Sequence, residues 1–356
     1  AVQSGAVLLL ALAAHLDQRL FALCCPASTP AVLVQGLCAR IRPRTAVNLQ
    51  ALACDALSLA FPLWRGHLAA ASPGRPPPMS RGDATEPAGQ RGVVASGASA
   101  PAQAASQEPA APATDEGLEW LSTQVLALYQ DPRVAQPCLA VMMQVGEADP
   151  PTLLQVMARS ARRTDMGPAY ASSALFVLVA FIRNSATRVR PLLPRLTEAL
   201  LRCLEPSDPS LRRQSLLGVT SALHELVQTF PMVAFHQHSQ KFAVGTGDGL
   251  IVVYDLRTAT KWRILEGHSG AVAALGFSPD GAKLASYSGR DESFRIWQCS
   301  SAGFLGGLLG SSGGCTKQQA LPRAPPPAAE DPPGAGAWRR VSLSWAQGSQ
   351  GGVALR

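Results

Sequence analysis

GHSGAVAALGFSPDGAKLASYSGRDESFRIWQ, residues 267–298, is the stretch that decides the fold of this chain. Its apolar run Ala271–Phe277 is predicted to be a buried strand, and Ser278–Gly281 is predicted to be a tight turn. Proline presets φ in such a turn, and Asp-Gly accepts the left-handed geometry that closes a hairpin. Two more strands are expected at Lys283–Ser288 and Ser293–Gln298, with a second short turn between them. The stretch is therefore predicted to form three hairpin-connected strands.

A second stretch, FAVGTGDGLIVVYDLRTATKWRILEGH at residues 242–268, repeats this pattern. Asp248 aligns with Asp291, and Tyr254 aligns with Trp297, at one constant offset. That offset lies within the roughly 40–45 residues of a WD-repeat blade, which begins with Gly-His and ends with an aromatic residue. Together the two stretches resemble two blades of a WD-repeat β-propeller.

The resemblance also implies a hydrogen-bonded network that fixes the turns of each blade. A buried His, a strand Ser or Thr, a turn Asp and an aromatic residue take part in it. The implied members are His268, Ser288 (or Ser286), Asp291 and Trp297 in the second blade, and Thr246, Asp248 and Tyr254 in the first. Tyr254 stands where Trp is usual and is expected to be a weaker anchor. An extra residue between Ser288 and Asp291 predicts a bulged turn and an imperfect network in the second blade.

Ser288, His268 and Asp291 would also suit a hydrolase triad. A nucleophilic serine needs an elbow such as G-x-S-x-G, however, and neither Ser286 nor Ser288 has one. Gly245–Gly249 lacks the spacing of a dinucleotide fingerprint and is followed by strand-like residues, so a hairpin turn is expected there. No catalytic or cofactor-binding residue is therefore predicted, and the chain is not expected to be an enzyme.

Composition excludes several classes of partner. The formal net charge of +7 comes from 31 basic residues spread along the chain, so no nucleic-acid-binding patch is predicted. None of the eight cysteines forms a C-x-x-C pair or stands at zinc-ligand spacing from a histidine, so no metal site is predicted. Such cysteines fit a reducing, cytoplasmic compartment. The apolar run Ala174–Ile182 is about half of a bilayer span, and no transmembrane segment is predicted.

Composition and periodicity divide the chain into six parts. These are a divergent helical segment at 1–70, a disordered linker at 71–117, an α-helical repeat segment at 118–230, two blades at 231–298, a Gly/Pro-rich loop at 299–337, also predicted to be disordered, and a partial third blade at 338–356. The predicted fold class is α+β multidomain: a HEAT- or armadillo-like α-solenoid followed by the last WD-type blades of a β-propeller.

Within the helical repeat segment, helices are expected at about 119–130, 136–147, 151–163, 170–186, 189–204 and 209–229. Ser207-Asp208-Pro209-Ser210 is expected to cap the last of these. Two and a half blades cannot close a propeller, which typically has about 4–8. Because the chain also begins with Ala1 rather than Met, it is expected to be the carboxyl-terminal part of a longer protein, with further blades upstream.

Two quoted stretches resemble one family in particular. They are TFPMVAFHQHSQKFAVGTGDGLIVVYDLRT at 229–258 and LASYSGRDESFRIWQCSSAGFLGGLLG at 284–310, and both are similar to the carboxyl terminus of WD proteins of the rabconnectin-3 beta type. The resemblance implies a cytoplasmic adaptor, peripherally associated with vesicle or endosomal membranes. Its implied partners are a rabconnectin-3 alpha-like protein and subunits of the vacuolar proton pump (V-ATPase), whose assembly and activity it would regulate. The alternatives are a substrate receptor of a ubiquitin ligase and a membrane-coat component.

Overall fold

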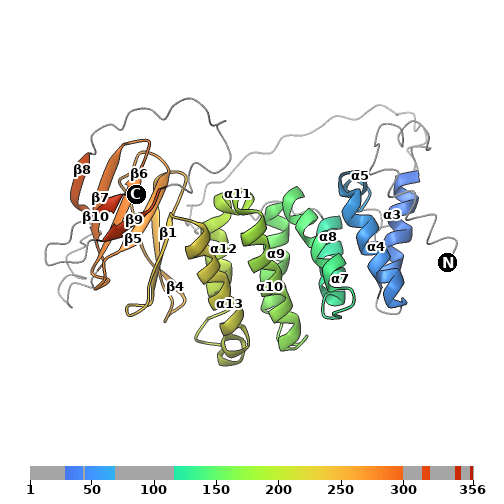
Figure 1. Cartoon of the computed structure of the whole chain (residues 1–356). Coiled ribbons are helices and arrows are strands. Elements are labelled where there is room, and N and C mark those ends of the chain that lie inside the picture. The colour runs from blue at the N-terminus through green and yellow to red at the C-terminus, as the bar shows by residue number, and fades with distance from the viewer. Residues whose placement is uncertain are drawn as a thin grey trace, which may run out of the picture.

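The computed structural model describes residues 29–42, 45–68, 116–299, 315–320, 341–345 and 353–355. In Figure 1 a row of helices leads from α3 to α13, and the strands lie beyond α13 at the other end of the row. The first 28 residues and most of the two segments predicted to be disordered lie outside the described residues. Of the predicted linker at 71–117, only Glu116 and Gly117 are described, and they begin helix α7.

The helices fall into two groups along the chain. Their bounds are α3 Thr29–Arg40, α4 Val47–Leu59, α5 Phe61–Arg65, α7 Glu116–Leu128, α8 Ala135–Ala148, α9 Pro150–Ala161, α10 Pro168–Asn184, α11 Ala186–Val189, α12 Leu193–Arg202 and α13 Pro209–Thr229, with a 3-10 turn, η1, at Arg190–Leu192. The groups are joined in space because α4 packs against α8, and α10 packs against both α9 and α13. This is a helical region; its solenoid character stays a prediction.

Proline and aspartate set several helix starts. Asp208 is the N-cap of α13, and its Oδ1 accepts a hydrogen bond from the Leu211 N–H at 2.9 Å, which confirms the predicted cap. The helix predicted at about 189–204 is confirmed in part: α12 forms it over Leu193–Arg202, but residues 190–192 form the 3-10 turn η1 and Val189 ends α11. Pro191 stands in η1 and has no N–H to continue a helix begun at Ala186.

Two four-stranded antiparallel sheets follow the helices. The first sheet has the order β1-β2-β3-β4, and the second has the order β5-β6-β7-β8. Their bounds are β1 Val233–His236, β2 Lys241–Gly245, β3 Ile251–Asp255 and β4 Thr260–Leu265, then β5 Val272–Phe277, β6 Lys283–Ser288, β7 Ser293–Gln298 and β8 Cys315–Ala320. The strands predicted at Lys283–Ser288 and Ser293–Gln298 are confirmed as β6 and β7.

The structure departs from the predicted loop at 299–337, because β8 lies inside it and pairs with β7. The outer edge of β7 would otherwise present a row of unpaired N–H and C=O groups, and pairing with β8 satisfies them. The predicted bulged turn in the second sheet is also wrong. Ser288 pairs with Ser293 in an unshifted β6–β7 ladder, so the ladder that flanks residues 289–292 carries no bulge, and Glu292 closes the turn with a φ of +47°.

The sheets stack on one another. Strands β1 and β2 pack against β5. A short antiparallel pair, β9 Leu343–Trp345 with β10 Val353–Leu355, also packs against β5 through β9. The indole Nε1 of Trp345 donates to the Gly276 carbonyl at 2.9 Å. In Figure 1 the first sheet lies next to α12 and α13 and the second sheet lies beyond it, with β8 farthest from the helices.

Candidate functional site

Four side chains from the second sheet and the loop that precedes it form a buried network. His268 comes from the loop before β5, Ser286 from β6, Asp291 from the β6–β7 turn and Trp297 from β7. The Trp297 indole donates to Ser286 Oγ at 2.8 Å, and Ser286 Oγ lies 2.7 Å from His268 Nε2. On the other side of the ring, His268 Nδ1 lies 2.9 Å from Asp291 Oδ2. The network therefore ties the sheet to the loop that enters it.

Donors and acceptors in this network have one consistent arrangement. Because the indole N–H occupies one lone pair of Ser286, the hydroxyl proton is free to go to His268 Nε2, and Nδ1–H then donates to Asp291. Burial disfavours the charged imidazolium and lowers the pKa of His268, which outweighs the effect of Asp291. Burial alone would raise the pKa of Asp291, but hydrogen bonds from Ser293, His268 and the Ser269 N–H hold it below its usual value. The network is a neutral histidine beside an ionised carboxylate.

Ser288 does not belong to this network, so its selection as the preferred strand serine is corrected. Its hydroxyl donates instead to the Gly270 carbonyl at 3.2 Å, and Ser286 takes the place between His268 and Trp297. Residues two apart in a strand point to the same face, so both serines face the same way. Only Ser286 lies level with the indole N–H of Trp297.

Of the three residues singled out in the first sheet, Thr246 and Asp248 lie together and Tyr254 lies apart from them. Thr246 and Asp248 form a side-chain hydrogen bond within the β2–β3 turn, and Thr246 Oγ1 also accepts from the Leu250 N–H at 3.0 Å. Tyr254 takes no part in that turn: its hydroxyl donates to Glu198 Oε1 of α12 at 3.4 Å. Burial, followed by the charge of Glu198, raises the pKa of the Tyr254 phenol, so the phenol stays protonated as a donor.

This contact belongs to a seam between the last helices and the first sheet. Glu198 also accepts a salt bridge from Lys261 Nζ of β4 at 2.9 Å. From α13, Arg212 Nη1 donates to the Arg257 carbonyl in the β3–β4 turn at 3.3 Å. Helices α12 and α13 therefore lie against the face of the first sheet that is opposite the second sheet.

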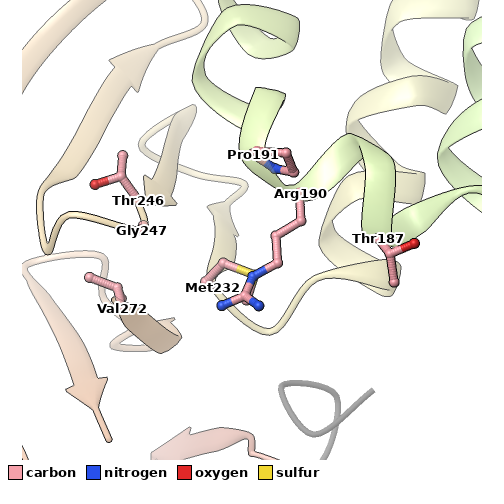
Figure 2. A pocket seen from close by; sticks show the side chains of 8 residues that line it. Thr187, Arg190, Pro191, Met232, Thr246, Gly247 and Val272 are labelled. Atoms are coloured by element: carbon pink, nitrogen blue, oxygen red, sulfur yellow. The ribbon is translucent and has the colours of Figure 1, made fainter. Parts of the chain in front are cut away.

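Three hollows open along this seam. The first, of about 290 Å³, is lined by Thr187, Arg190 and Pro191 from the helices and by Met232, Gly245, Thr246, Gly247 and Val272. In Figure 2 the Arg190 side chain extends from the helical side toward Met232, with Gly247 and Val272 beyond it. The second, of about 580 Å³, is polar and includes Arg162, Arg202 and Thr258. The third, of about 330 Å³, lies between α13 and strands β1 and β2 and is mainly apolar.

Sequence reasoning missed Glu198 and Arg212, which connect the helices to the sheet. One signal pointed toward Glu198. A tyrosine in the place of the usual tryptophan carries a hydroxyl, and a buried hydroxyl needs an acceptor. The identity of that acceptor depends on how helices and sheet pack, which repeat spacing does not contain.

Metal ligation and membrane insertion are two further roles to weigh for the part of the chain that the structure describes. There, no three His, Cys, Asp or Glu side chains gather as a metal site would require. Within the same residues no single helix has the length and apolar composition to cross a membrane. Helix α10 and residues 186–202 meet both criteria when they are taken together, but a bend of 105° separates them. Cys54 and Cys138 are buried free thiols whose sulfurs lie 3.9 Å apart.

Comparison with known proteins finds the same repeat. Residues 260–298, which span β4 to β7, match the family model "WD domain, G-beta repeat". A serine-threonine kinase receptor-associated protein of Dictyostelium discoideum is 38% identical over 65 residues, or 18% of this chain and 22% of that protein. WD repeat-containing protein 1 of Gallus gallus is 38% identical over 68 residues, or 18% and 11%. The match spans less than a quarter of the length of either relative.

Two solved structures overlap with parts of this chain. The β-propeller domain of Cps50 (Swd1) from Myceliophteria thermophila is 26% identical and overlaps 27% of this chain and 25% of that one, with a TM-score of 0.22. Raptor from Chaetomium thermophilum is 12% identical and overlaps 75% of this chain and 35% of that one, with a TM-score of 0.21.

Proposed function

We propose that this WD-repeat protein is a non-enzymatic scaffold that binds other proteins through its sheets and its helix–sheet seam. One observation supports this most directly. The side chains that most resemble a catalytic triad are Ser286, His268 and Asp291. They hydrogen-bond to one another and to Trp297 inside the second sheet. Ser286 is 0% exposed, so a substrate has no access to its hydroxyl. Because these side chains are buried, they support the fold, and binding at the surface is left as the role that we propose.

The seam supports the same proposal. Ligand and partner sites are commonly found where two structural units meet. All three hollows lie there, and each is lined by residues of both the helices and the strands. A partner seated at the seam would contact both parts at once, which is how a scaffold gains area without a deep pocket.

Affinity purification followed by mass spectrometry tests the scaffold proposal. The tagged full-length protein is purified from cells after mild cross-linking, beside a Trp297→Ala variant that disrupts the second sheet. The expected result is a small set of proteins recovered in near-stoichiometric amounts, part of which the variant loses. Recovery of no stoichiometric partner, together with a catalysed turnover that requires His268, would contradict the proposal.

A finer proposal concerns the pathway. The similarity of residues 229–258 and 284–310 to the rabconnectin-3 beta type supports a regulator of V-ATPase assembly and activity, cytoplasmic and peripheral to vesicle or endosomal membranes. V-ATPase subunits and a rabconnectin-3 alpha-like protein should then be among the purified partners. Loss of the protein should raise the pH of acidic compartments, as read with a ratiometric lumenal dye. Unchanged pH together with the recovery of ubiquitin-ligase or coat subunits would instead favour the alternatives.

A further inference from the structure

The third hollow of the seam, called here the α13 groove, is built as a recess for apolar side chains. One wall is the face of α13 that carries Leu216, Leu223 and Val227. These residues recur at helical spacing and so share one face of the helix. The other wall is the first sheet, through Phe235, Phe242 and Leu256. The groove has a volume of about 330 Å³.

The floor of the groove is part of the core, whereas its lip is uncovered. Leu223, Phe242 and Leu256 are buried, so the floor is already formed by folding. At the lip, Leu216 is 50% exposed and Phe235 is 40% exposed. Large apolar side chains that flank a concave apolar floor are typical of protein-binding surfaces.

The electrostatics of the groove favour an acidic occupant. Arg212 lies at one end, His224 and two glutamines lie along the rim, and no carboxylate lines it. Arg212 Nη1 donates to the carbonyls of Leu204 and Arg257, which are neutral acceptors. Among the described residues no salt bridge is found for Arg212, whereas the neighbouring Arg257 is paired with Asp255. A carboxylate placed at this end would therefore meet an uncompensated guanidinium.

We propose that the α13 groove binds a short segment of a protein partner that carries one or two bulky apolar side chains beside an acidic side chain. The volume suits one or two such side chains, and Arg212 selects for the acid. This proposal rests on the scaffold function and names the class of segment that the scaffold recognises. A membrane surface fits poorly because the apolar floor of the groove is recessed and only one arginine lines the groove.

Selection of random twelve-residue peptides displayed on phage, against the immobilised full chain, tests the proposal. Enriched peptides should share one or two of Leu, Ile, Met, Phe or Trp next to Asp or Glu. Affinity is then measured by fluorescence anisotropy of the best peptide. Leu216→Glu should weaken binding about tenfold or more, because it places a charge at the apolar lip and repels the acid. Leu217→Glu is the matched control: this neighbour is 81% exposed and lies outside the groove, so binding should stay within about twofold.

A second pair of variants tests the charge. Arg212→Gln replaces the cation that bonds the Leu204 carbonyl with a neutral amide, and it should weaken binding of the acidic peptide about tenfold. The same peptide with its acid replaced by the amide should bind Arg212→Gln and the unaltered protein equally. Arg213→Gln, on the exposed side of the same helix, should change neither affinity.

Three results would overturn the groove proposal. They are enrichment of neutral or basic peptides, equal effects of Leu216→Glu and Leu217→Glu, and self-association of the protein that Leu216→Glu abolishes, since the occupant would then be a second copy. Failure of the groove proposal can be told apart from failure of the scaffold proposal. If cellular partners are recovered equally with Leu216→Glu and with the unaltered protein, the scaffold stands and the groove proposal is wrong.

Discussion

Ser286 is the residue on which the buried network of the second sheet depends, because its hydroxyl serves both Trp297 and His268. Ser286→Ala would leave the indole N–H and the imidazole nitrogen buried without a partner. At about 1–3 kcal/mol for each of these two unsatisfied groups, the free energy of unfolding should fall by about 2–6 kcal/mol. Ser288→Ala, two residues along the same strand, removes only the bond to Gly270 and should cost about 1 kcal/mol.

Urea denaturation followed by tryptophan fluorescence measures both variants. The informative quantity is the difference between their free energies of unfolding, because each variant removes one serine hydroxyl from the same strand. Equal losses for Ser286→Ala and Ser288→Ala would show that the link through Ser286 contributes nothing beyond an ordinary strand hydrogen bond.

His268 makes the stability of the second sheet depend on pH. Its pKa is lower in the folded protein than in the unfolded chain, so the unfolded chain binds the proton more readily. The stabilisation is fully present above the unfolded pKa of about 6.5 and is lost as pH falls from there through the folded pKa. Asp291, whose folded pKa is also lowered, adds a further loss at more acidic pH.

Thermal melts of the full chain between pH 7.5 and pH 5 test this dependence. The melting temperature should fall with pH, and His268→Gln, although less stable throughout, should show a shallower fall. A steeper slope in His268→Gln would reverse the proposed direction of the shift.

Among the elements, the β2–β3 turn is one of those that couple the two sheets, because the Val272 N–H of β5 donates to the Thr246 carbonyl at 3.0 Å. Gly249 has a φ of +91°, and a Cβ at this position would lie 2.3 Å from the carbonyl oxygen of His268. Gly249→Ala should therefore cost about 2–4 kcal/mol, from left-handed strain together with a backbone clash. Gly247 lies in the same turn with nothing within 4 Å of its Cβ position, so Gly247→Ala should cost less than about 1 kcal/mol. Chemical denaturation of the two variants separates these outcomes, and similar losses would mean that the turn does not contact the second sheet.

Strands and helix caps were largely predictable from sequence, because local rules determine them. The turn Ser278–Gly281 and the strands on either side follow from proline, Asp-Gly and alternating side chains, and Gly281 indeed has a φ of +67°. Strand β8 was not predictable, since the local sequence CTKQQA becomes a strand only beside the open edge of β7. The choice between Ser286 and Ser288 failed for a similar reason: both face the same way, and the reach of Trp297 decides between them.

Across the whole molecule, the seam is what repeat spacing could not predict. Phe242 and Tyr254 are cross-strand partners in the first sheet, and both are fully buried on the side that α12 and α13 cover. A neighbouring blade would be expected to cover such a face in a propeller, and here helices do so. The Tyr254 hydroxyl shows how helices can cover this face in place of a blade, because it donates a hydrogen bond to the Glu198 carboxylate of α12. The helical region and the first sheet therefore share one apolar interface.

That interface predicts the behaviour of the strands without the helices. A fragment of residues 231–356 would expose Phe242 and Tyr254 to water and remove the partner of the Tyr254 hydroxyl. Repeat units that lose their covering neighbour cannot bury their faces, and newly open apolar surface promotes association. The fragment should therefore aggregate or bind the dye anilinonaphthalene sulfonate strongly, whereas the whole chain should sediment as a discrete species with little dye binding. Analytical ultracentrifugation and dye fluorescence of the two proteins at equal concentration make the comparison. A monomeric fragment with a single cooperative melt would show that the helices are dispensable for the sheets, and that the seam is a contact surface without a role in their stability.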